Sequence, residues 1–134
     1  LFENPAHTFV GHFIGSPGMN IFPVTLNSMG ISIGHCHLPL EAKVLAQIAQ
    51  RSYQSLKVGI RPEFVHVWDN PYDDALLCDV ERCDNMGTYK LLHLRLSGFA
   101  FIARLREEQA VPKNQAYFSF PQHWLKHYLD DYLL

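Results

Sequence analysis

The stretch "LLHLRLSGFAFIARL", residues 91–105, decides the fold. Its centre is Ser97-Gly98, a dipeptide that suits a tight turn because glycine adopts backbone angles that other residues avoid. Strict alternation on both sides of that turn is typical of strands with one buried face, so the stretch predicts a β-hairpin. The alternating apolar residues are Leu92, Leu94 and Leu96 before the turn, and Phe99, Phe101, Ala103 and Leu105 after it.

The same alternation extends outward from the hairpin through most of the chain. Short apolar-polar runs are separated by turn residues, of which Asn27 to Gly30 is the clearest group. Many short strands with regular turns favour a small β-barrel over a layered α/β fold. Further strands are predicted at residues 22–26, 31–40, 56–60, 64–68, 78–80 and 117–120.

Three segments depart from this pattern. Asn4-Pro5 supplies a cap residue and a first-turn proline, and the following apolar residues have helical spacing up to a stop at Gly15 to Pro17. Residues 41–53 also fit one short helix. The tail, residues 121–134, has apolar residues on one helical face but is equally compatible with a short turn followed by a strand.

Size and charge narrow the function classes. The chain has 134 residues, 48% of them hydrophobic and 18% charged, which suits one compact globular domain. Its formal net charge of -2 argues against binding to nucleic acid or an anionic membrane. No apolar run is long enough to span a bilayer, and the three cysteines are interpreted as reduced thiols of a cytosolic protein.

The glycines, histidines, cysteines and aspartates of this sequence, which in other proteins bind phosphate or metal or act in catalysis, do not form a recognisable active site here. None of the eight glycines is followed by lysine, so the phosphate-binding loop of ATPases is absent. In His35 to His37, strand geometry puts two imidazoles on one face and the thiol on the other, which favours exposed histidines over a metal site. Cys78 and Cys83 are interpreted as core residues, and Asp73-Asp74 and Asp130-Asp131 as solvated loop or helix-surface charges.

Three segments in order resemble one family, the ATPase subunits of carbohydrate-type ABC importers, which include the maltose and glycerol-3-phosphate systems. "NPAHTFVGHFIGSPGMN" (residues 4–20) resembles the segment that follows the nucleotide-binding domain in those subunits. "LKVGIRPEFVHV" (56–67) resembles their G-I-R-P-E motif, and "DNMGTYKLLHLRL" (84–96) resembles a hairpin with a Met-Gly pair. The matching motif residues are Gly59, Arg61, Pro62, Glu63, Met86 and Gly87.

The resemblance implies a mainly β fold: an OB-like small β-barrel with an N-terminal helix and one or two short helices, known as the transport-associated OB domain. Residues 1–18 would be a helix and turn linking to a missing ATPase domain, and residues 19–134 the OB-like regulatory domain. This fragment would then be non-catalytic and hold no cofactor, since ATP and Mg belong to the ATPase domain. The resemblance also implies a homodimer, permease partners, and a peripheral place at the inner face of the cell membrane.

Roles for individual residues follow from the same resemblance and from their chemistry. An Arg61–Glu63 pair is expected to pin a corner between two strands, a role in shaping the fold that is favoured over ligand contact. A segment that docks onto the ATPase domain is expected at Gly15, Ser16, Pro17, Met19 and Asn20, although these residues also fit a simple helix stop. Residues of the C-terminal tail that are more often core than interface, but are the best candidates for a dimer patch, are Trp124, Tyr128 and Tyr132.

Two other function classes remain open. One is a small-ligand sensor, since related domains of molybdate importers bind oxyanions, and this would require converging basic groups. The other is an OB barrel that binds nucleic acid, which would require a basic groove with stacking aromatic residues. Docking of an inhibitory protein is known in the maltose branch, and no residue of this sequence decides whether it occurs here.

Overall fold

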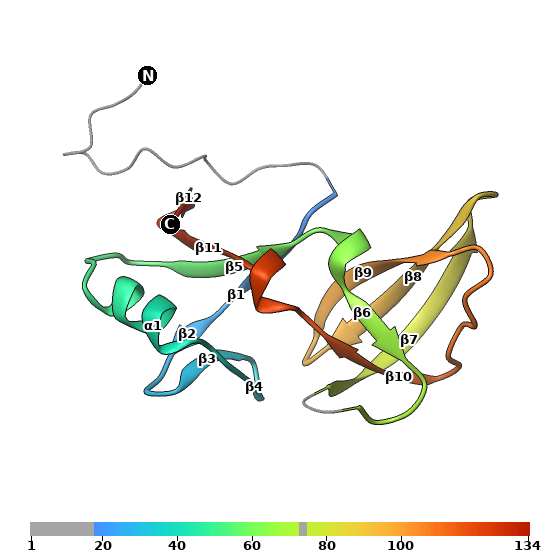
Figure 1. The fold of residues 1–134 in the computed structure, drawn as a ribbon, viewed down its shortest axis with the longest axis horizontal. Coiled ribbons are helices and arrows are strands. Elements are labelled where there is room, and N and C mark those ends of the chain that lie inside the picture. Colours follow the sequence, from blue (N-terminus) through green and yellow to red (C-terminus); the bar gives the residue numbers. More distant parts are fainter. Residues whose placement is uncertain (1–17, 73–74) are drawn as a thin grey trace, which may run out of the picture. The chain divides into compact units, whose positions relative to one another are not determined.

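The computed structural model describes residues 18–72 and 75–134, and these residues are mainly β (Figure 1). They divide into two compact units. The first unit contains the described residues up to Gly59 together with Leu125–Leu134, and the second unit contains Ile60–Trp124. The described part of the chain has no helix long and apolar enough to cross a membrane. The mainly β fold predicted from the sequence is confirmed.

The first unit is built on two sheets and one helix. A three-stranded antiparallel sheet has the order β2 (Thr25–Leu26), β3 (Gly30–Ile33) and β4 (Cys36–Pro39). The core of this unit includes the fully buried residues Phe22, Ile31, Ile33 and Val58. The second sheet has the order β1 (Asn20–Pro23), β5 (Leu56–Ile60), β11 (Lys126–Leu129) and β12 (Tyr132–Leu133).

The strand predicted over residues 31–40 is in fact a hairpin. Gly34 has a φ of 58°, and Ile33 pairs with Cys36, so the chain reverses at Gly34-His35. The apolar residues change phase across this turn, from odd positions (Ile31, Ile33) to even positions (Leu38, Leu40), because two residues paired across a two-residue turn are three apart in sequence. This change of phase is the local sign of a hairpin. His35 and His37 are exposed, as predicted, but Cys36 is half-buried and not buried, and His35 lies in the turn and not in a strand. In residues 18–72 and 75–134 there is no cluster of three metal-ligating side chains.

The helical predictions have different outcomes. Helix α1 (Ala42–Ala49) forms inside the predicted range and buries Ile48 completely, but it is shorter than residues 41–53. The predicted N-terminal helix lies outside the described residues, and so do Gly15, Ser16 and Pro17.

The C-terminal tail adopts the second of its two predicted forms. A 3-10 helix at Gln122–Trp124 is followed by strand β11, in which Tyr128 pairs with Lys57 and Leu129 with Leu56. An edge of β5 is available to this segment, and sheet pairing overrides the helical spacing of the apolar residues.

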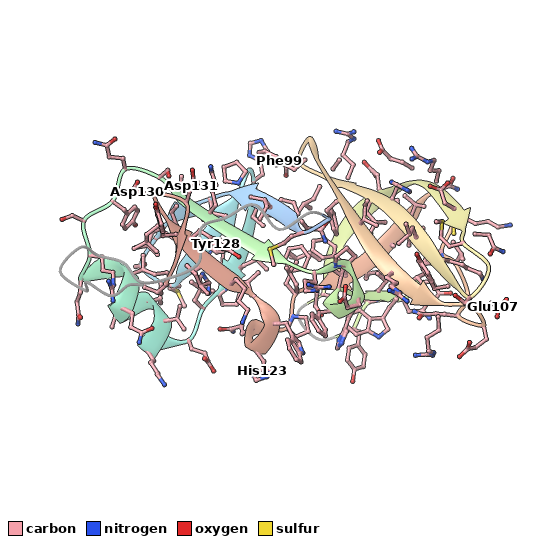
Figure 2. The ribbon with its side chains drawn as sticks, turned by 90° about the horizontal axis from the view of Figure 1, so that it is seen from above. Phe99, Glu107, His123, Tyr128, Asp130 and Asp131 are labelled. Atoms are coloured by element: carbon pink, nitrogen blue, oxygen red, sulfur yellow. The ribbon has the colours of Figure 1, made fainter. Side chains whose placement is uncertain are left out.

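The turn between β11 and β12 is made by Asp130 and Asp131, which both have positive φ angles of 50° and 69° (Figure 2). Asp130 Oδ1 accepts hydrogen bonds from the backbone N–H groups of Gln54 (2.8 Å) and Ser55 (2.9 Å). Asp131 Oδ1 lies 2.7 Å from Lys57 Nζ. These aspartates are turn residues, Asp130 exposed and Asp131 half-buried, as solvated loop charges would be. The sequence did not predict that their carboxylates tie the C-terminal hairpin to the segment that enters β5.

Replacing Asp130 with alanine should lower the free energy of unfolding by about 2 kcal/mol, since two backbone donors lose a charged acceptor and alanine tolerates positive φ poorly. Asp130→Asn keeps an acceptor and tolerates this conformation, so we expect it to lose less than half as much. Urea unfolding of the three proteins measures the difference. Equal stability of wild type and Asp130→Ala would contradict the bracing role.

The second unit contains a five-stranded antiparallel sheet and the 3-10 helices Pro62–Phe64 and Gln122–Trp124. The hairpin that decides the fold forms as predicted, with Leu96 paired to Phe99 across Ser97-Gly98. The ring centroid of Phe118 lies 4.9 Å from the ring centroids of both Phe101 and Phe120. The strand order is β6 (His66–Trp68), β10 (Gln115–Ser119), β7 (Leu76–Asn85), β8 (Tyr89–Leu96) and β9 (Phe99–Arg106).

The two remaining cysteines have different surroundings on β7. Cys78 is buried, as predicted, but Cys83 is exposed, so its predicted place in the core is wrong. The register of β7 against β8 shifts between Val80 and Arg82, and the residues from Glu81 to Cys83 that follow are all exposed. A bulge of this kind changes which residues face the core and is invisible in the spacing of apolar residues. Asp73-Asp74 lies outside the described residues.

Candidate functional site

Gly59, the first motif residue, lies in β5 of the first unit where three side chains approach the backbone. A Cβ atom at this position would lie 2.9 Å from Ile21 Cδ1, 3.0 Å from Met19 Sδ and 3.1 Å from Tyr128 Cε2. The Tyr128 hydroxyl also donates a hydrogen bond to Met19 Sδ over 3.5 Å. Glycine suits this position because side chains from distant parts of the sequence close over the strand, and a larger residue would displace them.

This packing changes the interpretation of three predicted interface residues. Asn20 is only 7% exposed and Tyr128 only 6%, while Met19 is half-buried. Burial also raises the pKa of the Tyr128 hydroxyl above its ordinary value. Tyr128 is therefore a core residue and cannot serve in a dimer patch, and Asn20 presents almost no surface for docking.

Arg61, Pro62 and Glu63 form the corner that follows β5. The strand ends at Ile60, and Arg61 keeps an extended backbone, as expected for a residue before proline. Pro62 then begins the 3-10 helix Pro62–Phe64. Arg61 Nε donates a hydrogen bond to Glu63 Oε2 over 2.8 Å. Partial burial favours a higher pKa for Glu63, but hydrogen bonds from its own backbone N–H and from Arg61 outweigh it and leave the pKa lowered.

Met86 and Gly87, the remaining motif residues, form the turn between β7 and β8. Gly87 has a φ of 99° and its N–H donates to Asn85 Oδ1 over 2.9 Å. The Met86 N–H donates to the carbonyl oxygen of Tyr89, while its side chain is 50% exposed. The glycine is explained by the positive φ alone, so this motif sets the hairpin geometry.

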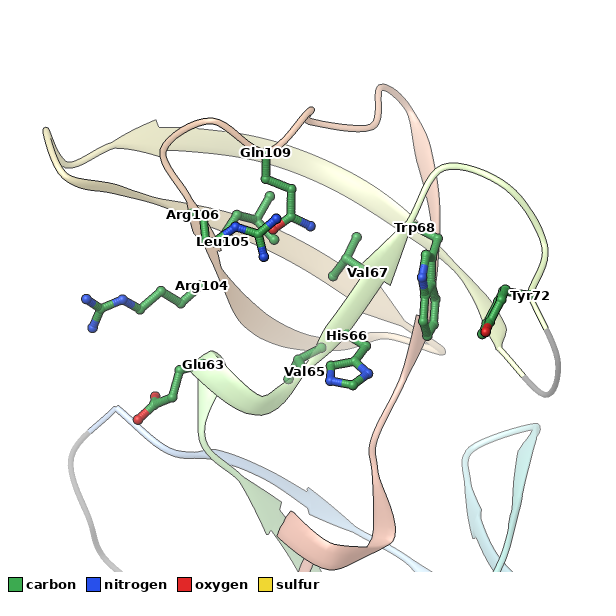
Figure 3. Close-up of a pocket in the computed structure, with 10 residues that line it drawn as sticks. All are labelled: Glu63, Val65, His66, Val67, Trp68, Tyr72, Arg104, Leu105, Arg106 and Gln109. Atoms are coloured by element: carbon green, nitrogen blue, oxygen red, sulfur yellow. The ribbon is translucent and has the colours of Figure 1, made fainter.

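A groove of about 800 Å³ lies beside the Glu63 corner in the second unit (Figure 3). Its floor consists of the buried residues Val65, Val67 and Leu105. The walls come from β6 and the end of β9, which are the two edge strands of the five-stranded sheet. The groove therefore occupies the place where a fully closed barrel would pair its first and last strands.

One wall of the groove is aromatic. The rings of Trp68 and Tyr72 stack with centroids 5.0 Å apart and an interplanar angle of 29°. His66 lies edge-on to Trp68, with ring centroids 5.8 Å apart. Figure 3 shows Trp68 between Tyr72 and the rest of the groove, so Tyr72 supports the indole from behind.

The opposite wall carries cationic and amide side chains. Arg106 Nε lies 3.0 Å from Glu108 Oε2, and the Arg104 guanidinium lies over the Tyr89 ring, 3.9 Å from its centroid. Gln109 completes this wall. Its backbone carbonyl oxygen accepts a hydrogen bond from Lys90 Nζ, which leaves the side-chain amide out of that bond. Such a wall can hold an anion through guanidinium and amide donors.

The sequence analysis missed this groove. The local signals are two pairs of residues that share one face of a strand, His66 with Trp68 on β6 and Arg104 with Arg106 on β9. Neither pattern says that the two strands become facing edges of one sheet, because that depends on the strand order.

The other two candidates for a dimer patch keep exposed rings. Trp124 stacks on Phe64 with centroids 3.9 Å apart and an angle of 5°, yet the residue is 39% exposed. His123 packs edge-on against Trp124. Tyr132, in β12 of the first unit, is 38% exposed. Each ring has enough free surface to join an interface.

Comparisons with known proteins agree with the fold. Residues 15–65 match the family described as the MalK OB fold domain. The chain is 32% identical over 120 residues to the trehalose/maltose import ATP-binding protein MalK of Thermococcus litoralis, covering 83% of this chain and 32% of that protein. It is 40% identical over 131 residues to the trehalose import ATP-binding protein SugC of Mycobacterium tuberculosis, covering 86% of this chain and 33% of that protein.

A solved structure has a similar fold at much lower sequence identity. The cytoplasmic molybdate-binding protein ModG matches with a TM-score of 0.59 and 10% identity, covering 85% of this chain and 96% of that one. This likeness shows the fold alone. The chain spans about a third of the length of the curated relatives that it matches. It belongs to the MalK-type OB-fold domains at the C-terminal end of sugar-importer ATP-binding subunits.

Proposed function

We propose that the chain is the non-catalytic regulatory and dimerisation domain of the ATP-binding subunit of an ABC importer for sugars or a related solute. The observation that carries this proposal is the pattern of coverage. Most of this chain aligns with import ATP-binding proteins, yet it accounts for about a third of their length. In this proposal ATP and Mg are bound by the ATPase domain of the parent protein.

The proposed mechanism is mechanical. Two copies of the domain associate and keep their attached ATPase domains close together while these open and close. Tethering raises the effective concentration of one ATPase domain around the other without any added contact at the nucleotide. A regulatory protein that binds the domain in one state only would shift this cycle, by no more than its difference in affinity for the two states.

The proposed place of the parent protein follows from its partners. Import ATP-binding subunits act with permeases, so the parent would lie peripherally at the inner face of the membrane. Docking onto the ATPase domain remains assigned to Gly15, Ser16 and Pro17, together with the half-buried Met19. Dimer contacts are assigned separately to the exposed ring of Trp124 in the second unit and to that of Tyr132 in the first unit.

Sedimentation equilibrium of the purified chain tests the dimerisation role. We expect a monomer–dimer equilibrium that Trp124→Ala or Tyr132→Ala weakens tenfold or more, because large aromatic residues dominate interface energies. Met29→Ala is the matched control, since Met29 is an exposed apolar residue (67%) outside the proposed contacts. A chain that stays monomeric at every concentration, or variants that dimerise like wild type, would contradict the proposed contacts.

A further inference from the structure

We propose that the groove between β6 and β9 binds a nucleoside monophosphate, with the base stacked on Trp68 and the phosphate held beside Arg106. The first support is the shape of the groove. Its volume of about 800 Å³ falls within the range of small-molecule sites, and a buried apolar floor lies beneath polar walls.

The aromatic wall selects the ring. Trp68 has Tyr72 on one face, at 5.0 Å, and His66 at its edge, so its orientation is fixed by two neighbours. An indole that is held in place loses little conformational freedom when a planar ring stacks on it. Bases stack on such side chains with little dependence on sequence, because every base has a π-face.

The opposite wall selects the phosphate. In Figure 3 the side chains of Arg106 and Gln109 lie over the centre of the groove, across from Trp68. A guanidinium pairs with phosphate through two parallel hydrogen bonds, and the amide of Gln109 offers further donors. Of the carboxylates nearby, Glu63 is paired with Arg61, and Glu108 is paired with Arg106 through two exposed side chains. A bound phosphate would replace Glu108 as the partner of Arg106. Arg104, whose guanidinium lies over the Tyr89 ring, adds a second cation to this wall.

The ring and the anion together distinguish this ligand from simpler ones. An inorganic oxyanion would use the arginine wall and leave Trp68 bare. A neutral nucleoside would stack on Trp68 but has no phosphate to contact Arg106. The binding concerns this chain alone, so its failure would leave the tethering role intact, and a monomeric chain would leave the binding intact.

Fluorescence of Trp68 provides the test. The sequence has two tryptophans, so Trp124→Phe leaves Trp68 as the only reporter while preserving a ring against Phe64. We expect AMP to quench this fluorescence in a saturable way. Adenosine, ribose 5-phosphate, inorganic phosphate and molybdate should each bind at least tenfold more weakly than AMP. Calorimetry on the unmodified chain should give the same order of affinities.

Two variants and one control make the result specific. Trp68→Leu should weaken AMP binding tenfold or more by calorimetry, a factor equivalent to about 1.4 kcal/mol, within the range measured for base stacking. Arg106→Gln should weaken AMP binding similarly but leave adenosine binding unchanged. Arg82→Gln is the control, because Arg82 is also an exposed arginine with an acidic partner but lies outside the groove.

The outcomes that overturn the proposal are equally specific. Absence of AMP binding at millimolar concentration would do so, as would molybdate or phosphate that binds as tightly as AMP. Unchanged AMP affinity in Arg106→Gln would also overturn it. This variant alters an exposed side chain and should fold, so the test holds even where Trp68→Leu does not fold.

Discussion

The free energy of unfolding should fall by roughly 3 kcal/mol between pH 6.5 and pH 4 because of one residue, His127. His127 lies in β11, paired with Val58, and is 8% exposed. Its Nδ1 is buried without a hydrogen-bond partner in the described structure. Burial disfavours the charged imidazolium and lowers the pKa of His127 from 6.5 to about 4.

The direction of the effect follows from proton counting. Below pH 6.5 the unfolded chain binds a proton at His127, but the folded chain does so only near pH 4. The unfolded state therefore gains protons first, and stability declines as the pH falls through this window. Above pH 6.5 both states are neutral, and the contribution of His127 no longer depends on pH.

Urea unfolding at a series of pH values measures this loss. We expect His127→Phe to be nearly flat between pH 6.5 and pH 4.5, since a ring of similar size stays buried and no proton binds. His123→Gln, which removes an exposed histidine, should keep the wild-type slope. The same pH profile in wild type and His127→Phe would show that the imidazole is not held neutral by burial.

Gly30→Ala should lower the free energy of unfolding by about 3 kcal/mol or more, because the added methyl group meets backbone atoms. Gly30 begins β3 and pairs with Pro39 of β4. A Cβ at this position would lie 2.0 Å from the Leu38 carbonyl oxygen and 2.7 Å from the Pro39 Cα atom. Both atoms belong to the backbone, so they cannot rotate away, and the two strands must separate.

Gly87→Ala is the matched control for this steric argument. A Cβ at Gly87 meets nothing within 4 Å, so the cost there comes only from the positive φ and should be about 1 kcal/mol. Urea unfolding of both variants compares the two effects directly. If Gly30→Ala were as stable as Gly87→Ala, the close approach of β3 and β4 would not exist in solution.

The sequence predicts those parts of the fold that depend on nearby residues. The Leu92–Leu105 hairpin follows from an alternation and a turn within one short stretch. The bracing role of Asp130 was missed, because its partners Gln54 and Ser55 come from a distant part of the chain. The form of the tail was left open for the same reason, since the free edge of β5 selects a strand over a helix.

The candidate site was predicted less well than the fold. The motif residues Arg61 and Glu63 form the expected pair, because two residues at a proline corner need only local geometry. The groove beside them was missed, because its walls come from two strands that are not neighbours in the sheet. Gly59 was picked out by resemblance, but its physical reason needs Tyr128, which only the fold brings near.

The central claim is that this domain positions an ATPase and does not itself hydrolyse ATP. Release of phosphate from Mg-ATP by the purified 134-residue chain tests this most directly. We expect a rate no higher than that of buffer alone at any protein concentration. A rate that rises in proportion to the chain, and persists through successive purification steps, would contradict the claim.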